Sequence, residues 1–446
     1  MYLLVPREAA ADQLTLWLAA VDEPGPEDGL RLAAGSPGTQ EPTPWEAWPG
    51  DGTPVRVRHR EIRVTGLAPR QSCAFALEAD GTVVANADMS TLPAELPTLG
   101  DKPFTVLLGS CFSHLQDQEL RVGRTFLRMP HAARPDVKLM AGDQVYLDSP
   151  WYRFFASFSR DELRQAFLGQ YKESWGQVNG FARLLRSGAN YFSSDDHEFW
   201  NNAPNFVAFA RNTWTASGRR EWWDVARALY RTFQTPRPIA RFDVPPVSFL
   251  VADTRVDRDG DRGNFMTPAS LAAVQEWVGG LRGPGVLVVG QPLLQTTTGF
   301  LKGTFGDWNL PDFEQYAELS RIVAASEHHL VVLTGDVHFG RIARTSLRSG
   351  KELVEIISSP LSLVDRKAEG EWLAAPKRFP ASPVGGMTRG EVATEAGFAP
   401  TGGHFLTLEF TRLGAGANLR LRYWPVLDQT AVTPDFGRTI WEHKLV

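Results

Sequence analysis

The chain has 446 residues, of which 43% are hydrophobic and 22% charged, and its formal net charge is −5. This composition is typical of a folded globular protein, and the length predicts roughly two or three domains. Acidic and basic residues are interspersed without a basic block, which argues against a nucleic-acid partner. Only two cysteines occur, Cys73 and Cys111, so a disulfide framework is not expected.

The apolar runs have the length of strands and are far too short for a membrane span. The first residues, MYLLVPRE, carry neither the basic and apolar regions of a secretory signal nor a twin-arginine motif. As given, the chain is expected in the cytoplasm, or in the periplasm or outside the cell if a leader has been removed.

An all-β region is predicted at the start of the chain. Segments in which polar and apolar residues alternate, as in half-buried strands, lie at residues 13–18, 54–58, 61–65, 73–77 and 82–85. Asp80-Gly81 separates the last two segments and predicts a hairpin with a type I′ turn. Short strands at this spacing suggest a small β-sandwich.

A Pro-rich stretch at residues 91–100 marks the expected domain boundary. We expect residues 1–97 to form a β-sandwich domain of immunoglobulin or fibronectin type. Residues 101–446 would form a second domain that ends in a β-hairpin. Residues 364–401 show weak periodicity and receive no assignment.

The second domain shows strand and helix patterns in alternation. Buried strands are predicted at residues 104–109, 136–142, 247–252, 285–289 and 329–334. Helices are predicted at residues 160–168, 268–281 and 311–326, and the terminal hairpin at residues 404–410 and 418–423. Such alternation indicates an α/β domain with both faces of the sheet covered.

Polar clusters follow several of these strands, where open α/β sheets bind ligands. Cys111 comes directly after the strand at 104–109, and its thiol suits a metal ligand or a nucleophile. A packed core cysteine is the simpler alternative. Asp143 and Tyr146 follow the strand at 136–142, and one turn of chain would aim both at one ion. A capped turn is the alternative there.

Two further clusters carry carboxylates and histidines. Residues 195–198 read Asp-Asp-His-Glu, a group that repels itself unless cations neutralise it; a solvated acidic loop is the alternative. Asp336 and His338 follow the apolar strand at 329–334, and in an extended chain they would point to the same side. Together the clusters offer ligands for two metal ions that share a carboxylate. The sequence contains no Gly-x-Ser-x-Gly elbow and no P-loop.

The clusters at 109–111, 142–148, 195–198 and 335–338 occur in the order seen in PhoD-type alkaline phosphatases, which the sequence resembles. That family belongs to the calcineurin-like metallophosphoesterase superfamily. Residues 249–255, Arg258, 275–277, 307–308 and 358–360 are similar too, so the resemblance covers roughly residues 1–365. It implies a four-layer α/β/β/α sandwich preceded by the small all-β domain.

The resemblance also implies metal ligands. Cys111, Tyr146 and His338 would bind a first ion, expected to be Fe³⁺. Asp143 would bridge the two ions. Asp196 and Asp336 would bind a second, harder ion, expected to be Ca²⁺, which prefers oxygen ligands. Zn²⁺, Mn²⁺ or Mg²⁺ are alternatives for either position.

The implied reaction is hydrolysis of phosphate esters, in which a hydroxide held by the metals attacks phosphorus in line. Arg255 would face the phosphate, which a guanidinium can bind through two oxygens. His197 would bind a phosphate oxygen or protonate the leaving alkoxide, and Asp148 would orient His197.

The expected substrate is a small phosphate monoester or diester. One alternative is a phosphodiesterase that acts on phospholipids or nucleotides. Another is a non-catalytic binding protein with a vestigial metal site. The sequence gives no indication of the oligomeric state.

Overall fold

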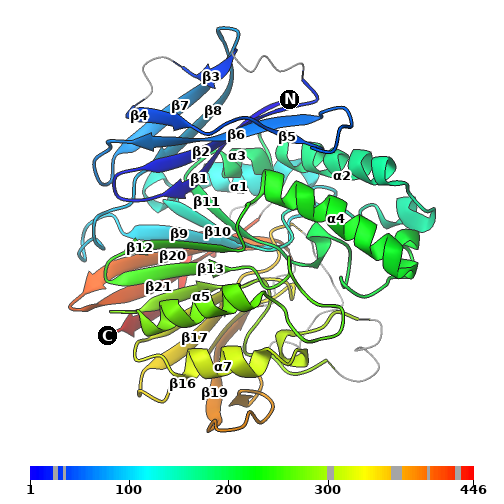
Figure 1. The fold of residues 1–446 in the computed structure, drawn as a ribbon. Helices are drawn as coiled ribbons and strands as arrows, with labels where there is room; N and C mark the ends of the chain where they lie inside the picture. The colour runs from blue at the N-terminus through cyan, green and yellow to red at the C-terminus, as the bar shows by residue number, and fades with distance from the viewer. Residues whose placement is uncertain (24–28, 34–36, 299–305, 363–373, 399–401, 427–432) are drawn as a thin grey trace.

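The computed structural model describes residues 1–446 apart from residues 24–28, 34–36, 299–305, 363–373, 399–401 and 427–432. The described chain is a mixed α/β protein with four β-sheets, and its strands outnumber its helices (Figure 1). Within these residues, no helix combines the length and the apolar character that crossing a membrane requires.

The first ninety residues form two antiparallel sheets, at the top of Figure 1. The five-stranded sheet contains β1 (Tyr2–Ala9), β2 (Leu14–Val21), β4 (Thr39–Pro42), β5 (Glu46–Trp48) and β6 (Val57–Thr65). The three-stranded sheet contains β3 (Leu30–Leu32), β7 (Ser72–Ala79) and β8 (Thr82–Ser90). The segment predicted at 61–65 belongs to β6, which begins at Val57 and runs straight through Arg60, so only residues 57–58 of the segment predicted at 54–58 are part of a strand.

The predicted hairpin is confirmed, with β7 antiparallel to β8. Asp80 has φ 48° and Gly81 has φ 79°. A type I′ turn requires left-handed backbone at both of these positions. The turn residues therefore fix the register of the hairpin.

A six-stranded sheet follows in the order β11-β10-β9-β20-β21-β22. Its strands are β9 (Phe104–Gly109), β10 (Val137–Ala141), β11 (Ala189–Ser193), β20 (His404–Leu413), β21 (Gly416–Pro425) and β22 (Arg438–Leu445). The first three strands are parallel, and β20 pairs antiparallel with β9. The predicted C-terminal hairpin is confirmed as β20 and β21.

An eight-stranded sheet has the order β12-β13-β14-β15-β17-β16-β19-β18. Its strands are β12 (Ile239–Val244), β13 (Val247–Ala252), β14 (Gly285–Val288), β15 (Leu330–Thr334), β16 (Gly340–Ser346), β17 (Glu352–Ile357), β18 (Arg378–Phe379) and β19 (Gly390–Phe398). Strands β13, β14, β15 and β17 are parallel, so their carboxyl ends share one edge.

Six α-helices among the described residues cover the large sheets. They are α1 (Arg121–Arg128), α2 (Arg160–Trp175), α3 (Phe181–Leu185), α4 (Ala216–Phe233), α5 (Pro268–Gly279) and α7 (Tyr316–Ala324). Helix α5 begins as predicted, since Thr267 caps it and Pro268 occupies its first position. The helix predicted from residue 311 begins only at Tyr316. A short 3-10 turn at Leu310–Asp312, capped by Asn309, precedes it.

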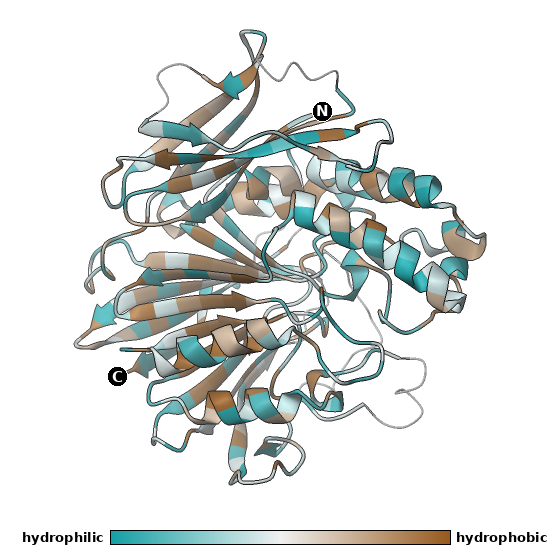
Figure 2. Cartoon of the chain, viewed as in Figure 1, coloured by the Kyte–Doolittle hydropathy of each residue, from teal (hydrophilic) through white to brown (hydrophobic). Residues whose placement is uncertain are grey.

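Three apolar clusters hold these elements together. Figure 2 shows hydrophobic residues in brown along the strands of the sheets. One lies between the two large sheets and contains Leu108 of β9 and Leu333 of β15. A second packs the six-stranded sheet against helices such as α2 and α4, and a third packs the eight-stranded sheet against α5 and α7. The first cluster also contains Leu16 of β2. The predicted boundary between residues 97 and 101 stays a prediction.

Candidate metal centre

The candidate site lies where strands of the two large sheets end. Cys111 follows β9, Asp143 follows β10, Asp195 follows β11 and Asp336 follows β15. Parallel strands present their carboxyl ends at one edge of a sheet. The two edges meet here, because a Cβ added to Gly335 would lie only 2.3 Å from the Cβ of Ser110.

Gly142 permits the close approach of the loops after β10 and β11. Its φ is +89°, and a Cβ at this position would lie 2.6 Å from the Cβ of Asp195. Glycine adopts this backbone conformation without strain and leaves room for the neighbouring chain. The strand–Gly–Asp sequence of this segment therefore serves both to turn the chain and to bring Asp143 beside Asp195.

Asp143 lies at the centre of the cluster and is 1% exposed. Its Oδ2 is 3.5 Å from Cys111 Sγ and 3.4 Å from the hydroxyl of Tyr146. Its Oδ1 accepts a hydrogen bond of 3.0 Å from the backbone N–H of His197. The structure thus brings the thiol and the phenol to the same carboxylate oxygen.

His197 and Asp148 form a pair beside this carboxylate. The Nδ1 atom of His197 lies 2.8 Å from Asp148 Oδ1, and Asp148 Oδ2 accepts from the N–H of Asn201 at 2.8 Å. The His197 ring also packs on Tyr146, with centroids 4.0 Å apart. Asp148 therefore orients the imidazole and leaves Nε2 as the other available ring nitrogen.

Four aspartates and His197 form two overlapping groups of possible metal ligands, and within each group the ligand atoms lie within 4.8 Å of one another. One group is Asp143, Asp196 and His197, and the other is Asp195, Asp196 and Asp336. Asp196 belongs to both. Its Oδ2 accepts from the N–H of Asn202 at 2.5 Å, which fixes the side chain.

The chain at Asp336 and His338 is not extended, contrary to the expectation from their spacing. Their φ angles are 69° and 57°, in the left-handed region. The His338 N–H donates to the hydroxyl of Ser359 at 3.2 Å, and that hydroxyl donates to Cys111 Sγ at 3.1 Å. Ser359 thereby links the His338 loop to Cys111.

Arg255 lies at the side of the cluster and is fully buried. Its Nε donates to Asp195 Oδ1 at 2.7 Å, and its Nη1 and Nη2 donate to the two oxygens of Asp307 at 2.9 and 2.8 Å. Nη1 also donates to the carbonyl of Ala203 at 2.6 Å. The guanidinium therefore holds two carboxylates in place, and the predicted contact with a phosphate stays a prediction.

Burial and mutual repulsion perturb the acids of the cluster. Burial, together with the charge of Asp196, raises the pKa of Asp143 well above its usual range. Burial raises the pKa of Asp195 to about 6, although Arg255 opposes this rise. Burial alone would lower the pKa of His197, but the charges of Asp148, Asp196 and Asp143 raise it well above the usual value.

These residues fit a metal centre. Four carboxylates, a thiol, a phenol and the imidazole of His197 converge in a buried space, and cations would relieve the repulsion among the acids. The Oδ2 atom of Asp195 is buried and has no hydrogen-bond partner among the described residues. An unpartnered carboxylate oxygen of this kind is suited to an ion.

Several residues of the site received no role from the sequence. Glu198 accepts from the backbone N–H groups of Asp143 and Asp195, both at 2.8 Å. Gln291 donates to Asp336 Oδ2 at 3.2 Å and also to Asp307. Gln291 follows β14 and Gly290, the same strand–glycine–polar pattern that identified the other clusters. That pattern was a usable signal for Gln291.

The fold and the cluster define an α/β protein with a candidate metal centre at the meeting edges of two sheets. A solved structure titled "Structure of PhoD" matches 98% of this chain and 91% of its own, with a TM-score of 0.59 and 16% sequence identity. The chain therefore has a PhoD-like fold, as the sequence resemblance predicted. No protein-family model matches the sequence, and no curated protein matches it.

Proposed function

We propose that this protein is a metal-dependent phosphoesterase of the PhoD type, with phosphatase or phosphodiesterase activity. The observation that carries the proposal is the convergence of Asp143, Asp196, His197 and Asp336 at the edges of two sheets. Metal-dependent hydrolases need carboxylate oxygens of this kind to hold two ions, and a nearby imidazole such as that of His197 can serve as the general acid. The PhoD-like fold supports the proposal, because the sequence motifs that carry these side chains resemble those of PhoD-type phosphatases.

In this proposal Cys111, Tyr146 and His338 hold a first ion, which we expect to be Fe³⁺, and Asp143 is shared by both ions. The contacts of Asp143 Oδ2 with Cys111 Sγ and with the Tyr146 hydroxyl support this assignment. Thiolate and phenolate suit iron. Asp196 and Asp336 would hold the second ion, for which Ca²⁺ is expected and Zn²⁺, Mn²⁺ or Mg²⁺ are alternatives.

Ions bound there would polarise the phosphate and lower the pKa of a water molecule. His197 would donate a proton from Nε2 to the leaving alkoxide. Burial lowers the pKa of His197, but the charges of Asp148, Asp196 and Asp143 raise it, which favours the protonated imidazole. Asp148 positions His197 through the 2.8 Å hydrogen bond to Nδ1. Arg255 would bind a phosphate oxygen by exchanging one of its carboxylate partners, Asp195 or Asp307, for the substrate.

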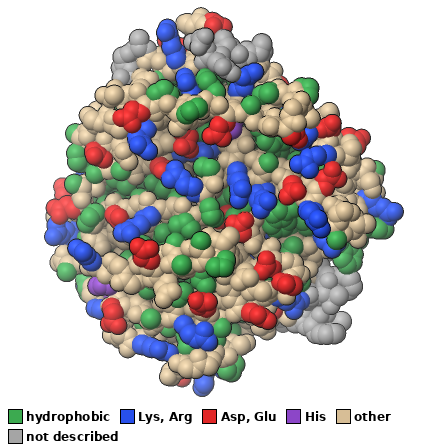
Figure 3. All heavy atoms as spheres, viewed as in Figure 1, with side chains coloured by type: hydrophobic (Ala, Val, Ile, Leu, Met, Phe, Trp, Pro, Cys, Tyr) green, Lys and Arg blue, Asp and Glu red, His purple; other side chains and the backbone are tan. Residues whose placement is uncertain are grey.

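We further infer a four-layer α/β/β/α arrangement for the part of the chain after residue 101, with a separate β-sandwich before it. The apolar clusters on both faces of the large sheets support the layers. The proposed substrate is a small phosphate ester. On the face drawn in Figure 3, basic and acidic side chains are interspersed, so a polyanionic polymer has little to attract it there.

Asp143→Asn tests this function. We expect hydrolysis of p-nitrophenyl phosphate and of bis(p-nitrophenyl) phosphate to fall by at least about 100-fold, since even groups behind the ligands of a metal site contribute about 10- to 100-fold. The matched control is Asp224→Asn, because the side chain of Asp224 on α4 is 42% exposed and forms a long ion pair with Arg227 at 3.7 Å. Equal activity of the two variants, or an inactive wild-type protein after addition of iron and calcium, would contradict the proposal.

A further inference from the structure

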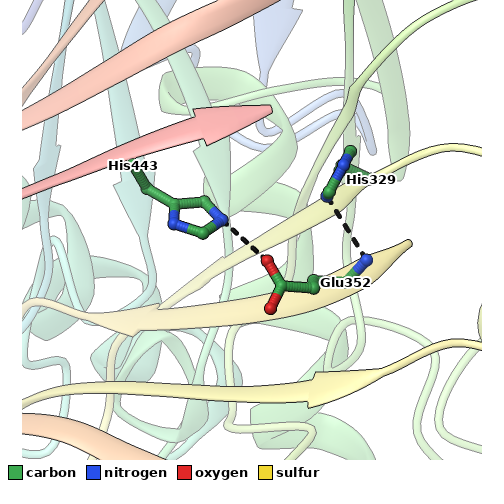
Figure 4. A group of neighbouring side chains, drawn as sticks. All are labelled: His329, Glu352 and His443. Carbon is green, nitrogen blue, oxygen red and sulfur yellow. Dashed lines mark hydrogen bonds and ion pairs between the residues drawn. The ribbon is translucent and has the colours of Figure 1, made fainter. Parts of the chain in front are cut away.

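A second group of possible metal ligands lies outside the site described above. His329, Glu352 and His443 each offer one ligand atom, and these atoms lie within 4.8 Å of one another (Figure 4). His329 directly precedes β15, Glu352 is the first residue of β17, and His443 lies on β22. The three residues come from two different sheets.

This group is separated from the candidate active site. His329 stands at the amino end of β15, whereas Asp336 follows the carboxyl end of the same strand. The five residues of β15 span about 17 Å at the usual rise of a strand. β17 runs parallel to β15 and contributes Glu352 at the same amino end. The two groups therefore occupy opposite ends of the sheet.

We propose that His329, Glu352 and His443 bind one divalent transition-metal ion of the zinc class. Two imidazoles and one carboxylate are a ligand set that suits Zn²⁺. His443 Nε2 and Glu352 Oε2 already face each other at 2.9 Å, so both point into the space that the ion would occupy. Glu352 and His443 are both 21% exposed, which leaves a route for an ion and for a water ligand.

The surrounding hydrogen bonds set the tautomer of His329 and the orientation of Glu352. His329 Nε2 lies 2.9 Å from the backbone oxygen of Val446, which can only accept, so this nitrogen carries the proton. Metal-binding histidines usually donate their second N–H in this way. The lone pair of His329 Nδ1 accepts a long hydrogen bond of 3.3 Å from the backbone N–H of Glu352, which the ion would displace. Arg344 donates to the other oxygen of Glu352 and fixes its orientation.

A bound ion would link the two large sheets at this end. In its absence, the His443–Glu352 hydrogen bond joins β22 of the six-stranded sheet to β17 of the eight-stranded sheet. Coordination by three side chains would replace that bond by a stronger connection. The structure therefore assigns this ion a structural role, independent of the proposed phosphoesterase activity.

Zinc content tests the proposal. The full-length wild-type protein, His443→Ala and His328→Ala would be loaded with Zn²⁺, dialysed, and measured by elemental analysis. His328 is the matched control, since it adjoins His329 in the chain but lies outside the ligand group. We expect His443→Ala to retain one equivalent of zinc fewer per chain than the wild type, and His328→Ala to retain the same amount as the wild type.

Thermal unfolding gives a second readout. Zn²⁺ should raise the melting temperature of the wild type and of His328→Ala by several degrees more than that of His443→Ala. His443→Gln keeps a hydrogen-bonding side chain and replaces the alanine variant if that one does not fold. Equal zinc content and equal shifts in all variants would overturn the proposal. Because the result is a difference between variants, it does not depend on metal bound at Asp143 or on any activity.

Discussion

Glu198 is the residue that organises the backbone of the candidate metal centre. It is fully buried and accepts from the N–H groups of Asp143, Gln144 and Asp195 at 2.8, 2.5 and 2.8 Å, and from Gln234 Nε2 at 3.1 Å. Burial raises its pKa to about 7, although these donors oppose the rise. The loops after β10 and β11 are thus held together by one carboxylate.

Glu198→Gln should destabilise the protein. An amide NH₂ in place of one carboxylate oxygen would face backbone donors and leave at least one of them without an acceptor, at a cost of about 1–3 kcal/mol each. Urea unfolding measures the change, and Glu318→Gln on the exposed side of α7 is the control. If both variants unfold at the wild-type midpoint, Glu198 does not have the role described.

At the scale of elements, the turn after β10 sets the distance between two loops of the site. Gly142→Ala would place a methyl group 2.6 Å from Asp195 Cβ in addition to the strain of φ +89°. Gly81→Ala carries similar strain, at φ +79°, but has nothing within 4 Å. We expect Gly81→Ala to cost about 1–2 kcal/mol and to leave the proposed phosphoesterase activity unchanged, whereas Gly142→Ala should lose both stability and that activity. Equal activity of the two variants would contradict the account of this turn.

The sequence predicts the elements better than it predicts their neighbours. Apolar runs such as those of β9 and β15 form buried strands as expected, because their pattern is local. The pairing of β20 with β9, almost three hundred residues apart in the chain, has no local signal. Likewise, the left-handed backbone of Asp336 and His338 depends on contacts such as the one with Ser359, so an extended chain was the wrong expectation.

The site residues divide in the same way. The motifs identify Asp143, Asp196 and His197, which the structure brings together. Arg255 was expected to face a phosphate, but its donors are directed at Asp195 and Asp307. The contact between Arg255 and Asp307 has no signal in the sequence and becomes visible only in the folded chain. A motif specifies the type of a side chain, whereas its partners depend on which strands become neighbours.

At the scale of the whole molecule, His404 makes stability depend on pH. It is fully buried on β20, and neither ring nitrogen has a hydrogen-bond partner among the described residues. Burial lowers its pKa to about 3, from about 6.5 in an unfolded chain. Between these values the unfolded state binds the extra proton, so stability is lost as the pH falls below about 6.5, by about 1.4 kcal/mol per pH unit.

His404→Phe should remove this contribution. The phenyl ring can occupy the space beside Tyr423 and Phe398, whose ring centroids lie 5.2 and 5.5 Å from that of His404. Unfolding free energies measured between pH 7 and pH 4 should then fall less steeply than in the wild type. The difference in slope should be about 1.4 kcal/mol per pH unit, the contribution of one proton. Other buried histidines, such as His59, contribute equally to the pH dependence of both proteins, so their contributions cancel in the difference. Parallel pH profiles would show that His404 is not buried in its neutral form.

Metal content tests the central claim, a metal centre around Asp143, most directly. Elemental analysis would compare His443→Ala, in which the proposed zinc site is removed, with the double variant His443→Ala/Asp143→Asn, both loaded with iron and calcium. We predict that the first protein retains metal at or above one ion per chain and shows a visible absorption band from Tyr146, and that the double variant loses both. Equal metal content in the two proteins, or none in either, would contradict the claim.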